Sequence, residues 1–172
     1  MAVAQQVADF KIGQKFQIIL SAVPNLAGGA LTPSDVPVWD IDLWDADNST
    51  ITGLHAAGRI VVCYFSAGTS EDWRSDYNKF SSSDKGAALP DWKGENWLRL
   101  NSPNVRSIMQ NRIQMAASKG CDAIDPDNTG MQLNDFSIHG SFLRNSLGRI
   151  DSPLKIPAND EIDGYVCVFP FL

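Results

Sequence analysis

One seven-residue run constrains the fold of this chain most. Residues 59–65, RIVVCYF, are almost all apolar, and most of them are β-branched or aromatic. Strands with this composition are typically covered on both faces, as in the parallel sheets of α/β proteins. The run therefore predicts a central strand with further structure packed on each side.

Other predicted strands lie on both sides of this run. KFQIIL (15–20) reads as a buried strand, and VWDIDL (38–43) alternates apolar residues with Asp40 and Asp42, which predicts a strand with one wet face. CDAI, from Cys121, begins another strand, and YVCVF (165–169) could be one more.

Two predicted helices separate the strands. ITGLHAA follows capping residues at 48–50 and closes at Gly58, and a longer helix begins at Ser102 and Pro103 and ends at Gly120. This alternation is typical of a parallel sheet with crossover helices, in which ligands bind at the carboxyl ends of the strands.

Composition narrows the function further. The chain has 172 residues, enough for one domain, and a formal charge of −6, which argues against a nucleic-acid partner. Its apolar runs are too short to span a membrane, and we expect no secretory signal at its start. Three cysteines are too few for a disulfide framework or a zinc site, so we interpret Cys63 and Cys121 as buried thiols.

A pair of carboxylates follows the CDAI strand. Asp125 and Asp127 flank Pro126 in the run DPDN. If this segment is extended, both side chains point the same way, and two carboxylates facing one pocket suit glycosidic hydrolysis. The alternative is a turn capped by the aspartates, which spacing alone favours.

A second cluster follows the central strand, in YFSAGTSEDWRSD. It combines hydroxyls, charges of both signs and an aromatic ring, a mixture that suits binding of a sugar. Its candidate residues are Tyr64, Ser66, Glu71, Asp72, Trp73 and Arg74. The alternative is a helix start capped by Ser70, which does not exclude a binding role.

These segments, from KFQIIL through CYFSAGTSEDWRSD to GCDAIDPDNTG, resemble the N-terminal half of the family 114 glycoside hydrolases. The resemblance implies an α/β fold, an incomplete (β/α)8 TIM-type barrel with about half of the barrel strands and an irregular C-terminal tail. It implies hydrolysis of α-linked galactosamine or galactose, of the endo-α-1,4-polygalactosaminidase or α-galactosidase type, without metal or organic cofactor. It also implies a secreted enzyme.

The resemblance also implies roles for individual residues. Asp127 is the best candidate for the family's first catalytic aspartate, with Asp125 beside it, where the family more often has Glu. The implied substrate-binding residues are Asp42, Tyr64, Ser66, Glu71, Trp73, Arg74 and Asn128.

The resemblance divides the chain into an N-terminal extension (1–14), a partial barrel (15–130) and an atypical tail (131–172). The family's second catalytic carboxylate lies on a later strand. The alternative function is therefore a catalytically inactive, truncated half-barrel that binds carbohydrate at most. We expect a polysaccharide or oligosaccharide as partner, no nucleic acid and no membrane, and open sheet edges that could pair two copies of the chain.

Overall fold

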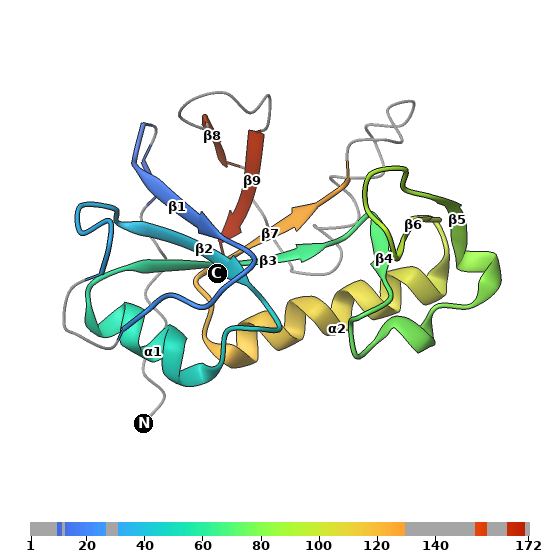
Figure 1. The fold of residues 1–172 in the computed structure, drawn as a ribbon, viewed down its shortest axis with the longest axis horizontal. Coiled ribbons are helices and arrows are strands. Elements are labelled where there is room, and N and C mark those ends of the chain that lie inside the picture. Colours follow the sequence, from blue (N-terminus) through green and yellow to red (C-terminus); the bar gives the residue numbers. More distant parts are fainter. Residues whose placement is uncertain (1–9, 12, 27–30, 130–153, 158–164, 171–172) are drawn as a thin grey trace.

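The computed structural model describes residues 10–11, 13–26, 31–129, 154–157 and 165–170 (Figure 1). Its main elements run in the order β1 (Phe16–Ile19), β2 (Val38–Asp42), α1 (Asn48–Ala56), β3 (Ile60–Ser66), β4 (Thr69–Glu71), β5 (Lys85–Ala88), β6 (Glu95–Leu98), α2 (Pro103–Lys119), β7 (Ala123–Asp127), β8 (Leu154–Pro157) and β9 (Tyr165–Pro170). Two short 3-10 turns, Tyr77–Lys79 and Ser82–Asp84, precede β5.

The larger sheet has the strand order β1-β2-β3-β7-β9-β8. Its first four strands pair in parallel, and β9 joins β7 in the antiparallel direction. The arrowheads of β1, β2, β3 and β7 all point toward a small antiparallel sheet, β4-β6-β5 (Figure 1). The predicted strands at 15–20, 38–43 and 59–65 are confirmed, as is the one at 165–169.

The helix boundaries follow local capping chemistry. Ser102 caps α2 by accepting a hydrogen bond from the backbone N–H of Val105, and Gly120 ends the helix with a φ of 90°, as predicted. The first turn of α1 differs from the prediction, because Asp47 is its cap: the carboxylate accepts from the Thr50 N–H at 2.7 Å.

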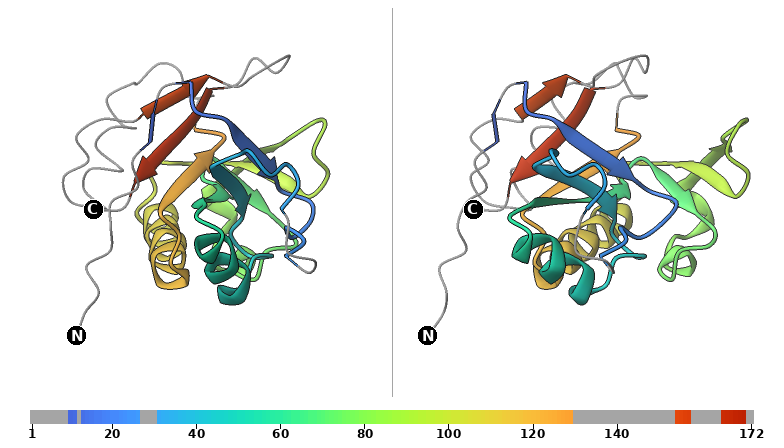
Figure 2. Two further views of the ribbon diagram at one scale, coloured as in Figure 1. Left: turned by 90° about the vertical axis from the view of Figure 1, so that its left-hand side faces the viewer. Right: turned by 60° about the vertical axis from the view of Figure 1, so that its left-hand side comes forward.

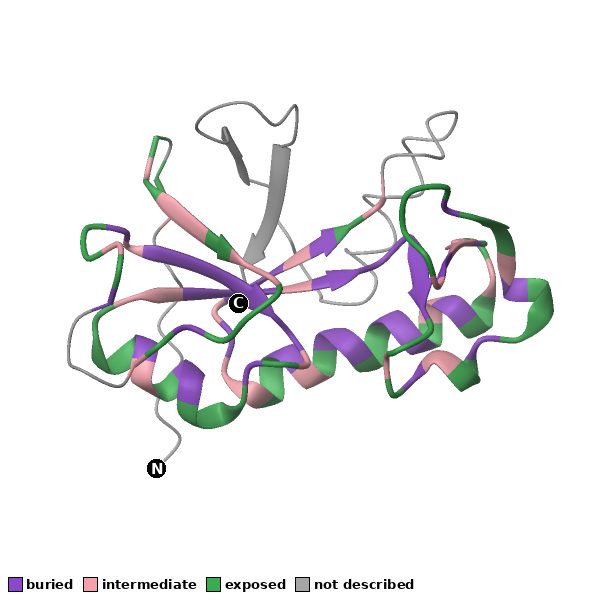
Figure 3. Ribbon diagram, in the orientation of Figure 1, coloured by how far each residue is buried: buried purple, intermediate pink, exposed green. Residues whose placement is uncertain are grey.

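Both helices lie side by side on the outer face of the curved sheet (Figure 2). Residues at alternate positions of the strands, among them Trp39, Val61, Cys63 and Ile124, form the core with the apolar face of α2. The buried residues of α2 appear in Figure 3 as purple segments that alternate with exposed green ones. The remaining strand positions, Val38, Val62 and Ala123, form a smaller apolar cluster on the inner face.

The predicted wet face of β2 is wrong. Asp40 and Asp42 are 2% and 1% exposed, because the sheet curves around the face that carries them. Alternation along the strand correctly separated these carboxylates from Trp39 and Ile41. It gave no information about what covers the second face.

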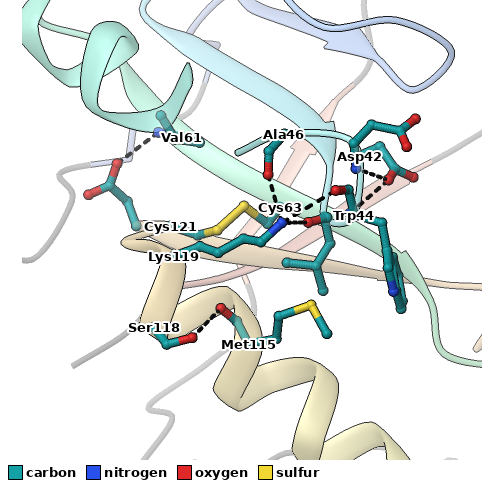
Figure 4. The surroundings of a disulfide bond; sticks show 12 residues. Asp42, Trp44, Ala46, Val61, Cys63, Met115, Ser118, Lys119 and Cys121 are labelled. Carbon is teal, nitrogen blue, oxygen red and sulfur yellow. Dashed lines mark hydrogen bonds between the residues drawn. A yellow bond between two sulfur atoms is a disulfide. The ribbon is translucent and has the colours of Figure 1, made fainter. Parts of the chain in front are cut away.

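The interpretation of Cys63 and Cys121 as thiols is also wrong. Their sulfurs form a disulfide that joins the middle of β3 to the residue after the C-cap of α2, across 58 positions of sequence (Figure 4). Beside it, the Lys119 ammonium donates to the carbonyl oxygens of Leu43 at 2.6 Å and Ala46 at 2.7 Å. These contacts tie the end of α2 to the turn after β2.

Candidate active site

Parallel register gathers the predicted site residues at one edge of the sheet. Tyr64 of β3 pairs with Asp42 of β2 on one side and with Asp125 of β7 on the other. Two residues further toward the carboxyl ends, Ser66 of β3 pairs with Asp127 of β7. Residues paired in this way point to the same side of a sheet. All five therefore lie on the inner face, opposite the helices, at or near the carboxyl ends of the strands.

The segment with the two aspartates is extended, not a turn. Asp125 and Asp127 both belong to β7, which runs in parallel register beside β3. The extended alternative therefore holds, and the two carboxylates project from the same face of one strand.

Asp127 is exposed and has two hydrogen-bond donors. Its Oδ2 accepts from the Tyr64 hydroxyl at 2.9 Å, and its Oδ1 accepts from the Asn128 N–H at 2.6 Å. Burial raises the pKa of Tyr64 far above its usual value, and the charge of Asp127 adds to the rise. The phenol therefore stays protonated and donates to Asp127 at any working pH.

Asp125 is partly buried, unlike the exposed Asp127. Burial raises its pKa to about 7, a hydrogen bond with Asp40 lowers it, and the charge of Asp127 raises it. A carboxyl group with this pKa can hold a proton near neutral pH, as a general acid must. β7 thus presents two carboxyl groups in different environments.

Arg74 connects the small sheet to β2. Its guanidinium donates to both oxygens of Asp42, at 3.0 and 2.5 Å, and to Glu71 Oε1 at 3.1 Å. Burial raises the pKa of Glu71, although Arg74 acts against that rise. This geometry fixes Arg74 at the edge of the site, because a forked guanidinium on a carboxylate is orientationally rigid.

A second buried arginine lies behind the first. Arg112 of α2 is fully buried, donates to Asp76 at 2.8 and 2.9 Å and to the carbonyl oxygen of Ser66 at 2.6 Å. Both guanidinium groups lie over the Trp44 ring, with centroid distances of 4.5 Å for Arg74 and 4.7 Å for Arg112. The loop after β3 is therefore anchored to the helix layer.

Ser66 and Asn128 hold the ends of β3 and β7 together. The Asn128 amide donates to the Ser66 hydroxyl at 3.0 Å, and that hydroxyl also contacts Thr69, which donates to Glu95 at 2.6 Å. Ser66 is only 1% exposed. Its contacts brace the strand ends, and its predicted contact with substrate stays a prediction.

The tryptophans differ in how far they are exposed to solvent. Trp39 belongs to the core, whereas Trp73, in the turn after β4, and Trp92, in the connection between β5 and β6, are 54% and 64% exposed. The Trp73 ring lies 6.0 Å from the Arg74 guanidinium carbon. Trp73 is therefore an accessible aromatic surface beside the charged cluster.

Three residues of this region were not among the predicted site residues. Asp40 had been placed on a wet face, Trp44 had been given no role in the site, and Arg112 interrupts the apolar stripe of α2. The sequence carried a signal for Asp40, because it shares the strand parity of Asp42. Arg112 also stood out as a charge between Met109 and Ile113.

Not every acidic residue near DPDN belongs to the site. Asp122 precedes β7, and its Oδ2 accepts from the Val61 N–H at 2.7 Å and contacts His55 Nε2 at 2.8 Å. These contacts lie at the opposite end of β7 from Asp127. His139 lies outside the described residues. Within the described part of the chain, no group of three or more His, Cys, Asp or Glu side chains is arranged to hold a metal ion, and no helix there is long and apolar enough to cross a membrane.

Parallel strands that alternate with helices on one face, with carboxyl groups gathered at the strands' carboxyl ends, define an α/β protein of the partial TIM-barrel class. The profile of the glycoside-hydrolase family GH114 matches residues 1–148, and the chain belongs to this family. The comparison with curated proteins found no match.

Solved structures agree with this assignment. Ega3 of Aspergillus fumigatus, crystallised with galactosamine, is 44% identical, with a TM-score of 0.69 over 85% of this chain. The glycoside hydrolase domain of PelA from Pseudomonas aeruginosa, at 17% identity and a TM-score of 0.61 over 77% of this chain, shares the fold. The match spans 58% of the Ega3 chain and 54% of the PelA chain. The predicted partial TIM-type barrel is therefore confirmed.

Proposed function

We propose that this chain is part of a glycoside hydrolase that cleaves α-linked galactosamine or galactose units in a polysaccharide. Family membership supports hydrolysis, and the likeness to a structure that contains galactosamine supports the sugar. The observation that carries the proposal is the pair on β7: Asp127, hydrogen-bonded by Tyr64, beside Asp125 with a pKa of about 7.

The two carboxyl groups suit different steps of glycoside hydrolysis. Protonated Asp125 donates its proton to the glycosidic oxygen as the bond from that oxygen to the anomeric carbon breaks. Asp127, which accepts two hydrogen bonds, acts at the anomeric carbon. There it either stabilises the positive charge that develops on the sugar or activates the attacking water. The hydrogen bond from Tyr64 keeps Asp127 in a fixed orientation, which favours a reactive geometry.

The charge of the site suits an amino sugar. The exposed Asp127 supplies negative charge on the inner face, where that charge acts on both Asp40 and Asp125. An ammonium group on a galactosamine unit would be attracted there, whereas an acidic polysaccharide would be repelled. The exposed face of Trp73 can stack on the C–H face of a sugar ring.

The disulfide supports a secreted protein. Bonds such as Cys63–Cys121 persist in oxidising compartments and are rare in reducing ones. This supports the extracellular location that the family resemblance implies. The division at residues 14 and 130 and the pairing of two copies through sheet edges stay predictions.

The direct test is release of new reducing ends from an α-1,4-linked galactosamine oligomer by the full chain. Asp127→Asn should abolish release, and Asp91→Asn, at an exposed aspartate, should leave it unchanged. Calorimetry on the same oligomer separates hydrolysis from the alternative, binding without cleavage. Heat of binding without new reducing ends from the wild-type chain would reject the proposed activity. Size-exclusion chromatography in parallel tests for paired copies.

A further inference from the structure

Asp40 is the least satisfied polar group on the inner face of the sheet. It is 2% exposed, and neither carboxyl oxygen faces a hydrogen-bond donor among the described residues. An ionised carboxylate in such a place is very unfavourable, because neither water nor a donor compensates its charge. Asp40 must therefore hold a proton or share one with a neighbour.

The neighbour is Asp125. In barrels, alternate strands contribute side chains to one interior layer, and β2 and β7 are alternate strands with β3 between them. The Asp125 carboxyl lies within hydrogen-bonding reach of Asp40. Two carboxyl groups at this distance form a hydrogen bond only if one of them is protonated.

Among the described residues, the other groups that act on Asp40 do not offer an alternative partner. Asp127 of β7 and Asp42 of β2 add further negative charge. Arg74, which donates to Asp42 on the same strand, is engaged by Asp42 and Glu71. β1 has no ionisable side chain in FQII, and β3 contributes Tyr64, whose hydroxyl donates to Asp127.

We propose that Asp40 is a positioning residue that keeps a proton in place and donates it as a hydrogen bond to Asp125. This proposal rests on the proposed function and deepens it. When Asp125 gives its own proton to the leaving oxygen of the sugar, it becomes a carboxylate. The Asp40 hydroxyl then stabilises that carboxylate by its hydrogen bond, and the proton of Asp40 stays on Asp40 throughout the step.

Two substitutions separate the hydrogen bond from the charge. Asp40→Asn keeps a donor of the same shape, whereas Asp40→Leu keeps the branched shape with two methyl groups and removes the donor. Loss of the donor should raise the pKa of Asp125, because the hydrogen bond from Asp40 lowers it. The pKa of Asp125 should therefore be similar in the wild type and in Asp40→Asn, and it should be higher in Asp40→Leu.

The experiment is carboxyl-carbon NMR of the full 172-residue chain with labelled aspartate, titrated from pH 4 to 9. In the wild type, the Asp40 signal should remain at the protonated position at pH 6, and in Asp40→Leu the Asp125 midpoint should rise by about one pH unit or more. An ionised Asp40 at pH 6, or an unchanged Asp125 midpoint in a folded Asp40→Leu, would overturn the proposal.

Thermal unfolding supplies a second test, which does not need turnover. The raised pKa of Asp40 means that wild-type stability is lost as pH rises above about 4, the unfolded value. Asp40→Asn lacks this loss. The difference between its melting temperature and that of the wild type should therefore increase by about 2 to 4 °C for each pH unit above about 4. Asp91→Asn should show a constant difference. A constant difference for Asp40→Asn would contradict the proposal.

These measurements distinguish the two proposals. If the titrations behave as expected and no sugar polymer is cleaved, the shared proton stands and the proposed hydrolysis fails. If the polymer is cleaved and the titration midpoint of Asp125 is the same in Asp40→Leu as in the wild type, the proposed hydrolysis holds and the proposed role of Asp40 fails.

Discussion

The Tyr64 hydroxyl of β3 donates a 2.9 Å hydrogen bond to Oδ2 of Asp127 on β7. The two residues are 63 positions apart in sequence and become neighbours because their strands pair in parallel. Burial prevents the phenol from ionising, so the bond always runs from Tyr64 to Asp127. The position of Asp127 in the site therefore depends on both strands, because β7 carries the carboxylate and β3 carries its donor.

Tyr64→Phe should lower the rate of galactosamine-polymer cleavage while preserving the fold. A hydrogen bond to a charged group contributes about 1.5–3 kcal/mol, so kcat should fall roughly 10- to 100-fold. Initial rates of reducing-end release measure the effect. Tyr77→Phe, in the small 3-10 turn where the ring contacts Lys85, is the matched control and should keep full activity. Equal rates for wild type and Tyr64→Phe would remove Tyr64 from the mechanism.

The pH profile of cleavage should fall on the alkaline side. Asp125, with a pKa of about 7, must be protonated to act as a general acid. kcat/KM should therefore decline about tenfold per pH unit above pH 7, and Asp125→Asn should remove most of the activity below it. A profile from pH 5 to 9 checks this. A rate that rises through pH 7 would assign Asp125 the opposite role, as a base.

Gly68→Ala should disturb the contact between the loop after β3 and the end of β7. An added Cβ would lie 1.8 Å from the carbonyl oxygen of Asn128, which is backbone and cannot move aside cheaply. We expect a loss of about 1–3 kcal/mol of stability, with weaker cleavage as Asn128 shifts. Gly86→Ala is the control, because its Cβ would meet its nearest atom at 3.4 Å. Thermal melting compares the two variants, and equal melting temperatures would contradict the prediction.

Loss of the disulfide should destabilise the whole sheet. The bond between Cys63 and Cys121 closes a loop of 58 residues, for which chain entropy predicts about 4 kcal/mol. A Cys63→Ala/Cys121→Ala double variant should unfold at clearly lower denaturant concentration. Cys167→Ala leaves this bond intact and serves as control. If reduction with dithiothreitol leaves the wild-type midpoint unchanged, the bond is absent from the protein in solution.

Elements with strong local signals were predictable. The run at 59–65 becomes β3, and α2 begins after Ser102 and ends at Gly120, because capping and apolar periodicity act within a few residues. The order of these elements also located the candidate site at the carboxyl ends of the strands, where Asp127 and Tyr64 meet.

Features that depend on distant contacts were not predictable. Alternation separated Asp40 from Trp39, but the helices cover the face of Trp39 and the curvature of the sheet buries the face of Asp40. Cys63 and Cys121 each read as an isolated apolar residue until the end of α2 brought their sulfurs together. Local sequence therefore specified which way each side chain points. Packing of the strands and helices specified what each side chain meets there, because the covering groups come from remote parts of the chain.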